Sequence, residues 1–429
     1  MENSVKNLIQ FIDHSPSCFH VIKNAKKQFL EHGFIQLEEK EHWNLEEGKS
    51  YFVERNGSSM IAFHLPKKDF QGFHIVASHS DSPTYRIKEQ PEMSVEKHYT
   101  KLNIERYGGM IPETWFDRPL SVAGRIIIEE NGQIKDQLVN VDRDLMIIPN
   151  LAIHMSRSSN ESKQLNPQKD LLPLCGGNLT KDGFEEMIAK ESGVEKEDIL
   201  SYDLFLYNRM RGTTLGINEE FVAAPKLDDL ECAYSSIEGM LNAKLSKDYV
   251  TVCAVFDNEE VGSGTKQGAG STFFPEVLKR ISYLCGKNEE EYYMAVADSF
   301  MLSADNAHAV HPNYQDKTDP TNRPYINEGI VLKYNASQKY TTDANSAALV
   351  KYLCKKEKIK CQVFFNRSDM LGGSTLGNIL TGQVSIKAAD IGLPQLSMHS
   401  TYETAGCKDL DDMITLMGSF YELGKEVQI

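Results

Sequence analysis

The sequence has none of the long apolar stretches that cross membranes or direct secretion. No segment approaches the roughly 18 uncharged apolar residues that a membrane-spanning helix needs. The first residues, Met1 to Lys6, lack the basic and apolar regions of a signal peptide. We therefore expect a cytoplasmic protein that does not bind membranes.

Paired cysteines and basic runs are also missing. The eight cysteines of this 429-residue chain form no C-x-x-C pair, and Cys18, Cys253 and Cys354 lie in apolar patterns, where cysteine acts as a small hydrophobic residue. This usage is typical of a reducing compartment. The 46 basic and 61 acidic residues give a formal net charge of −15. Because no run of Lys or Arg stands against that charge, the sequence disfavours binding to nucleic acid.

Two adjacent carboxylates, Glu259 and Glu260, follow an apolar run from Val250 to Phe256. The run has the length and the β-branched content of a buried strand, and the chain then turns through Gly262 and Gly264. Both acids should therefore lie at the carboxyl end of a strand, where open α/β sheets bind their ligands. Acidic residues in loops are usually only solvated, so the pair indicates a functional site only if further candidate residues accompany it.

Further segments carry acidic or histidine side chains at the ends of predicted elements. His79 and Asp81 follow the apolar run Phe73 to Ala77 and precede Pro83, which suits a metal-binding histidine oriented by an acid, although a surface turn fits equally well. The remaining candidates are Asp228 ahead of a helical pattern, Asp305 after Ser303, and His399 after the segment Leu393 to Met398.

Several of these carboxylates would repel one another if they shared one cleft. Buried, unpaired carboxylates normally become protonated, and divalent cations remove that cost. The candidate ligands are too many for one tetrahedral zinc but suit two ions if one carboxylate bridges them. Glu259 is then left over as a general base. These ligands are His79, Asp228, Glu260, Asp305 and His399.

Spaced motifs carry these residues: HSDSP (79–83), LDD (227–229), DNEEVGSG (257–264), SADNAHAVHPNY (303–314) and SMHSTYE (397–403). In this order they closely resemble the M18 metallo-aminopeptidases, the aspartyl aminopeptidase family, over essentially the whole chain. The resemblance implies that His79 and Asp305 hold one zinc and that Glu260 and His399 hold the other. Asp228 would bridge the ions, Asp81 would orient the His79 side, and Glu259 would be the base.

The resemblance also implies the reaction. The protein would be a di-zinc aminopeptidase that removes residues from peptides with a free N-terminus, with cobalt or manganese as alternatives to zinc. Two metal ions would activate a water molecule and polarise the scissile carbonyl. Glu259 would take the proton of the water and return it to the leaving amine.

Two other functions stay open at this stage. An M42-like or M20-like peptidase or deacylase would have the same kind of metal site, but it fits the HAVHPNY and SMHS segments less well. A self-assembling homologue without catalysis would keep the fold, but the intact base and ligand set favour an enzyme.

The positions of the candidate ligands predict the domain organisation. His79 comes early, the other ligands follow residue 225, and the stretch between supplies none. We expect a catalytic domain of residues 1–86 and 221–429, interrupted by an inserted domain of residues 87–220. The runs 122–130 and 133–141 flank Asn131-Gly132, a strong hairpin signal, so the inserted domain should be mostly β. Alternating β runs and helical patterns predict an α/β sandwich around a mixed sheet elsewhere.

The family also suggests an assembly and a further site residue. M18 members dimerise through the inserted domain, build dodecamers from the dimers, and pass a histidine into the active site of the partner. His154 lies in the matching segment, from Ile148, where it would donate a hydrogen bond to the developing oxyanion. A histidine packed near the core is the alternative.

Lys333 bears on the choice of substrate. It matches the position at which acidic-selective M18 enzymes present a lysine to the side chain of the substrate, which implies a preference for N-terminal Asp or Glu. Tyr402 stands where an arginine is usual, and residues 369–374 depart from the usual pocket segment. A neutral-residue aminopeptidase is therefore the alternative.

Overall fold

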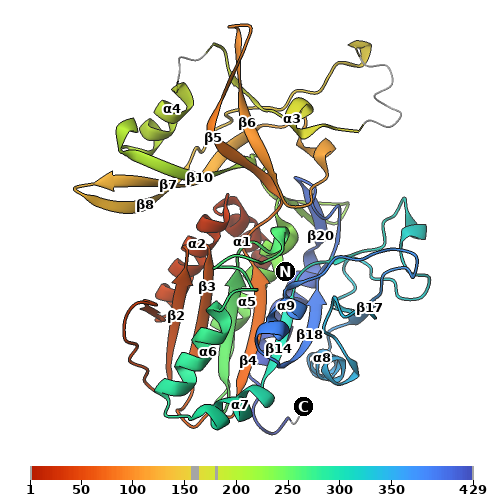
Figure 1. Cartoon of the computed structure of the whole chain (residues 1–429). Coiled ribbons are helices and arrows are strands. Elements are labelled where there is room, and N and C mark those ends of the chain that lie inside the picture. Colours follow the sequence, from red (N-terminus) through yellow and green to blue (C-terminus); the bar gives the residue numbers. More distant parts are fainter. Residues whose placement is uncertain (1, 156–163, 179–181, 428–429) are drawn as a thin grey trace.

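The computed structural model describes residues 2–155, 164–178 and 182–427, and it contains three β-sheets (Figure 1). The largest has nine strands in the order β1-β2-β3-β13-β4-β14-β18-β16-β17. It is mixed, because β4 runs parallel to both β13 and β14, whereas β3 is antiparallel to both of its neighbours and β16 is antiparallel to β18. Its strands are β1 (Ile35–Leu37), β2 (Lys49–Arg55), β3 (Ser59–Leu65), β4 (Phe73–His79), β13 (Val250–Phe256), β14 (Phe300–Ala304), β16 (Ile330–Lys333), β17 (Cys361–Phe364) and β18 (Lys387–Gly392).

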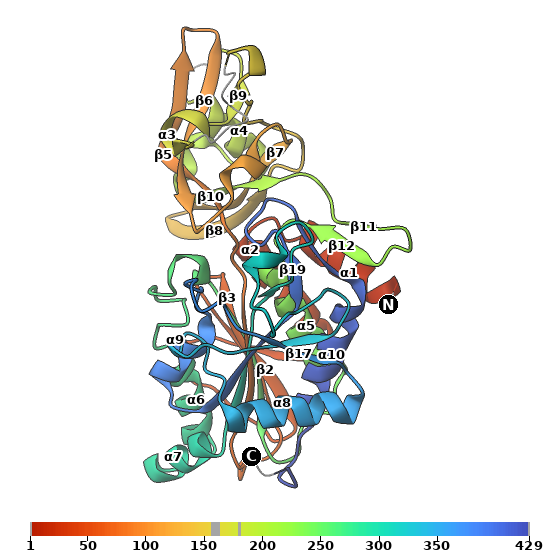
Figure 2. The same ribbon diagram turned by 90° about the vertical axis from the view of Figure 1, so that its right-hand side faces the viewer.

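Helices cover both faces of this sheet (Figures 1 and 2). The central strands β4, β13 and β14 are buried along their whole length, which explains their unbroken apolar sequences. One face packs on α1 (Glu2–Asp13), α2 (Cys18–Glu31), α5 (Leu227–Asn242), α8 (Ala344–Glu357) and α10 (Cys407–Tyr421). The other packs on α6 (Phe273–Leu284), α7 (Glu289–Ala297) and α9 (Leu376–Gln383). The expected α/β sandwich around a mixed sheet is confirmed.

A six-stranded antiparallel sheet forms a separate lobe beyond the carboxyl end of β4 (Figures 1 and 2). The predicted hairpin is confirmed: Glu130 pairs with Gln133, and Asn131 and Gly132 take positive φ angles of 53° and 75°. The lobe has its own apolar core and carries α3 (Pro167–Asp170) and α4 (Gly183–Ser192). Its strands are β5 (Thr84–Val95), β6 (Tyr99–Tyr107), β7 (Leu120–Glu130), β8 (Gln133–Asn140), β9 (Leu174–Gly176) and β10 (Ile199–Asn208).

A third sheet has five strands, which neighbour one another in the order β11-β12-β20-β19-β15. Its strands are β11 (Thr213–Leu215), β12 (Phe221–Ala224), β15 (Ala307–His308), β19 (Pro394–Leu396) and β20 (Glu403–Gly406). The sheet positions the start of α5 after β12 and the loop between β19 and β20, both of which carry candidate site residues. Within the described ranges, no helix is long and apolar enough to cross a membrane.

Candidate metal centre

The sheet topology brings the candidate residues to one edge. His79 ends β4 and lies opposite Phe256 of the parallel strand β13, so the loop with Glu259 and Glu260 leaves the sheet beside it. Strand β14 borders β4 on its other side and is followed directly by Asp305. Carboxyl ends of parallel strands share an edge, which explains why residues far apart in sequence meet here.

Asp228 lies between two histidines. His79 Nε2 is 3.5 Å from Asp228 Oδ1, and His399 Nε2 is 3.3 Å from Asp228 Oδ2. His399 Nε2 is also 3.5 Å from Glu260 Oε2. One carboxylate therefore faces a different group of side chains with each of its oxygen atoms.

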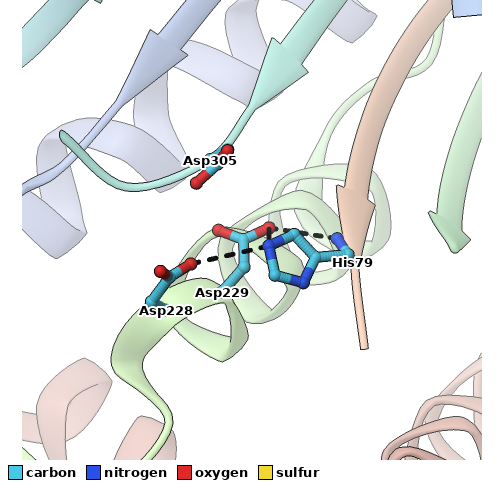
Figure 3. Close-up of side chains that lie close together, drawn as sticks. All are labelled: His79, Asp228, Asp229 and Asp305. Atoms are coloured by element: carbon cyan, nitrogen blue, oxygen red, sulfur yellow. Dashed lines mark hydrogen bonds and ion pairs between the residues drawn. The ribbon is translucent and has the colours of Figure 1, made fainter. Parts of the chain in front are cut away.

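The side chains fall into overlapping groups whose ligand atoms lie within 4.8 Å of one another. One group contains His79, Asp228, Asp229 and Asp305, which Figure 3 shows converging from separate elements. Another contains Asp228, Glu260 and His399, and a third joins His79 to Glu259 and Glu260. Asp228 belongs to the first two groups, which is the arrangement that a bridging ligand requires.

The electrostatics of the cluster demand positive charge. Burial, with nearby acids, raises the pKa of Glu260 well above its ordinary value and that of Glu259 to about 8. Burial would also raise the pKa of Asp228, but the neighbouring imidazoles of His399 and His79 lower it below its ordinary value. Oxygen Oδ1 of Asp228 has no hydrogen-bond partner among the described residues, nor has Oδ1 of Asp229. A buried set of oxygen and imidazole ligands with orphaned oxygens fits divalent cations.

Asp81 orders the loop that carries the paired glutamates. Its carboxylate accepts the backbone N–H groups of Glu259 and Glu260, each at 3.1 Å. Its backbone carbonyl lies 3.1 Å from His79 Nδ1, and its Oδ1 lies 3.4 Å from the same nitrogen. Asp81 therefore fixes the far side of the His79 ring, as partners of metal-binding histidines do.

Sequence reasoning gave no role to Asp229 or Glu403. Asp229 accepts the backbone N–H of His79 at 3.0 Å. Glu403 accepts the backbone N–H of His399 at 2.7 Å. Both acids lie inside the recognised motifs: Asp229 follows Asp228 directly, and Glu403 lies four residues after His399. This closeness to a candidate ligand was the signal in the sequence that could have identified them.

Lys333 and His154 lie in contrasting places. Lys333, at the end of β16, is 2% exposed and its Nζ lies 3.7 Å from Asp305 Oδ2. His154 lies in a short 3₁₀ turn, Ile153–Met155, on the lobe of the six-stranded sheet, where its side chain is exposed. The described metal-ligand groups do not include it.

Comparisons with known proteins agree on one family. Residues 11–421 match the family model described as aminopeptidase I zinc metalloprotease (M18). A probable M18 family aminopeptidase 2 of Clostridium acetobutylicum is 45% identical over 431 residues, which cover 97% of this chain and 98% of the relative.

Solved structures show the same relationship. The chain is 36% identical to one in the cryo-EM structure of the Ape4 and Nbr1 complex, with a TM-score of 0.95, covering 98% of this chain and 85% of the other. It is 26% identical to the mApe1 dodecamer of S. cerevisiae, with a TM-score of 0.85, covering 98% of this chain and 97% of the other.

Proposed function

This chain belongs to the M18 family of zinc metalloproteases and is a metallo-aminopeptidase, and from that premise we propose a di-metal mechanism for it. The observation that carries the proposal is the position of Asp228, whose two oxygens face His79 and His399 separately. Asp228 would bridge two divalent ions, which we propose to be zinc. His79 and Asp305 would complete one site, and Glu260 and His399 the other.

The residues of the chain divide the work around these ions. Bound zinc would supply Lewis acidity toward a water molecule and the scissile carbonyl. Glu259 would take the proton of that water and later give it to the leaving amine. Asp81 holds the backbone of Glu259, so the base keeps its position during both transfers.

The substrate would be a peptide with a free N-terminus. We propose a modest preference for N-terminal Asp or Glu, because Lys333 is a buried ammonium beside Asp305. Burial lowers the pKa of Lys333, but the charge of Asp305 and those of other nearby groups together outweigh it and raise the pKa above its ordinary value, so the side chain stays charged. A neutral preference is the second candidate, because Nζ already donates to the backbone carbonyls of Asp305 and Asn306.

Self-association would complete the enzyme. The proposed inserted domain, residues 87–220, contains most of the lobe and of its core, and its surface exposes Leu151, Ile153 and Met155 by 48%, 47% and 76%. Such an apolar group suits a dimer interface. We propose that dimers form through it, that they assemble into a dodecamer like that of the S. cerevisiae relative, and that His154 serves the partner's site.

One experiment tests the proposed reaction. Purified protein is assayed with an Asp-Leu dipeptide, its N-acetylated form and an internally cleavable blocked peptide, before and after chelation and zinc return. We expect cleavage of the free-amine dipeptide alone, loss with chelator, and recovery with about two zinc ions per chain. Cleavage of the blocked peptides, or full activity with one ion, would contradict the proposal.

A further inference from the structure

Residues 107–114, called here the bracing segment, leave β6 of the six-stranded sheet and pass between the two sides of the metal centre. The candidate ligands and the base all come from outside that sheet. The contacts of the bracing segment nevertheless reach the loop of the base on one side and the loop of His399 on the other.

Tyr107 makes the contact on the base side. Its hydroxyl donates to Asp81 Oδ2 at 2.7 Å and accepts a hydrogen bond from Asn258 Nδ2 at 2.8 Å. Because Asp81 in turn accepts the N–H groups of Glu259 and Glu260, the phenol fixes the acceptor that holds both glutamates. A hydrogen bond to a buried carboxylate is among the stronger neutral-donor contacts in proteins.

The two glycines that follow pass close to the ligands. Gly108 has a φ of +80°, and a Cβ there would lie 3.1 Å from Glu260 Cβ. Gly109 lies against the His399 ring, because a Cβ at Gly109 would lie 3.7 Å from Nδ1. Since His399 Nε2 faces Asp228 and Glu260, this contact occupies the opposite side of the imidazole.

The end of the segment holds the His399 loop. The N–H of Ile111 donates to the carbonyl of His399 at 3.0 Å. Thr114 Oγ1 accepts the N–H of Thr401 at 3.1 Å, and the Thr401 hydroxyl donates to the Thr114 carbonyl at 2.7 Å. Three hydrogen bonds therefore tie the loop of a candidate ligand to the lobe.

We propose that the bracing segment is a positioning element of the metal centre, with Tyr107 setting the base loop and Thr114 setting the His399 loop. This rests on the proposed di-metal function. It makes the six-stranded lobe part of the active centre, because the lobe orients the base and one ligand in its own chain. A shift of the lobe would then alter both sides of the centre together.

The test on the base side compares two tyrosines of the same lobe. Tyr107→Phe removes the donor to Asp81, whereas Tyr85→Phe removes a buried hydroxyl that has no hydrogen-bond partner among the described residues. We expect Tyr107→Phe to lower kcat about tenfold or more, with KM within about twofold and bound zinc unchanged. Tyr85→Phe should retain the wild-type kcat. Equal kcat in the wild type and Tyr107→Phe would overturn the proposal.

A double-mutant cycle separates this role from general folding. If Tyr107 acts through Asp81, then Tyr107→Phe in an Asp81→Ala background should lower kcat no further. Full additivity of the two losses would overturn the assignment, because it would place the effect of Tyr107 elsewhere.

The test on the ligand side uses metal affinity rather than activity. Thr114→Ala removes the acceptor for Thr401, and Thr114→Ser keeps it. In competition with a chromogenic chelator, Thr114→Ala should lower the affinity for the less tightly bound zinc ion about tenfold or more. Thr114→Ser should have the wild-type affinity. Unchanged affinity in Thr114→Ala would overturn this half.

The two proposals fail in different ways. An inactive wild type with two bound zinc ions would refute the proposed function while the affinity test of Thr114 still stands. A fully active wild type with fully active Tyr107→Phe and unchanged zinc affinity in Thr114→Ala would refute the bracing role alone.

Discussion

The carboxylate of Glu403 accepts the backbone N–H of Asp228 at 3.0 Å, although the residues are 175 positions apart. Its other oxygen accepts the N–H of His399. His399 has a φ of +67°, in the left-handed region that residues other than glycine rarely adopt. Glu403 is only 1% exposed. One buried acid therefore fixes the backbone of two candidate ligands that arrive from different sheets and helices.

Replacing Glu403 by Gln should remove one of the two hydrogen bonds that hold the backbone of the candidate ligands. The amide keeps the shape but can offer only one acceptor atom, so one backbone N–H loses its partner at a cost of about 1 to 3 kcal/mol. We expect Glu403→Gln to lose part of its bound zinc and to melt at a lower temperature. Metal analysis and thermal unfolding measure the two effects.

Asp409 provides the matched control, because it is a buried acid that accepts the N–H groups of Asn327 and Gly329. Asp409→Asn should lower stability comparably while retaining zinc. Full zinc occupancy in Glu403→Gln would show that the anchoring does not affect the ligands.

Replacing Glu259 by Gln should abolish proton transfer and leave the ions in place. The substitution keeps the volume and removes the acceptor of the proton of the water, so kcat should fall by about 10² or more. Single-turnover kinetics with parallel metal analysis measures the loss. Loss of zinc instead would identify Glu259 as a ligand, and near-normal turnover would place the base elsewhere.

The strand ends explain how far sequence reasoning reached. Runs such as Phe73–Ala77 and Val250–Phe256 predicted buried strands because both faces are covered, and the structure has β4 and β13 there. The roles of the residues that follow them stay predictions. Glu403 and Tyr107 could not be assigned, because their partners lie in segments remote in sequence and depend on how the sheets and the lobe pack.

The exposed position of His154 leads to a complementation experiment. If it serves the site of a neighbouring subunit, His154→Ala and Glu259→Gln homo-oligomers should each be weakly active, because removing an oxyanion donor costs about 10² in kcat. Mixed under exchange conditions, they should regain activity, since some mixed subunits pair an intact base with an intact His154. Fluorescence energy transfer between labelled subunits verifies exchange. No recovery despite exchange would remove His154 from the partner's site.

His74 should contribute an acid-sensitive component of stability. It is 2% exposed on β4 and stacks on Tyr249 at a centroid distance of 4.0 Å. Burial lowers its pKa from 6.5 to about 3. Between these values the unfolded chain binds a proton that the folded chain does not, so stability falls as the pH drops, by up to ~1.4 kcal/mol per pH unit.

His74→Phe keeps an aromatic ring in the stack and removes this titration. Relative to the wild type, the variant should therefore gain stability progressively from pH 7 to pH 5, which urea unfolding at fixed chelator concentration measures. The exposed His42, changed to Phe, serves as the control. Parallel stability curves for the wild type and His74→Phe would contradict the assignment.

Lys333 connects substrate choice to the metal centre. Its Nζ donates to the carbonyls of Asp305 at 2.8 Å and Asn306 at 3.1 Å, and it lies 5.1 Å from the centre of the Tyr340 ring. An ammonium has a third proton, which a carboxylate of the substrate could accept. In Lys333→Met that contact disappears, so the ratio of kcat/KM for Asp-initiated over Leu-initiated peptides should fall about tenfold or more.

The ratio matters because Lys333 also faces Asp305, so the substitution can weaken metal binding for every substrate. That general loss lowers both kcat/KM values equally and cancels in the ratio, whereas a lost contact with the acidic side chain does not. Lys339→Met, at an exposed lysine whose Nζ reaches the carbonyl of Gly372, is the control and should keep the wild-type ratio. If wild-type protein cleaves Leu-initiated peptides at least as well as Asp-initiated ones, and Lys333→Met leaves that ratio unchanged, the lysine supports Asp305 only and the enzyme is a neutral aminopeptidase.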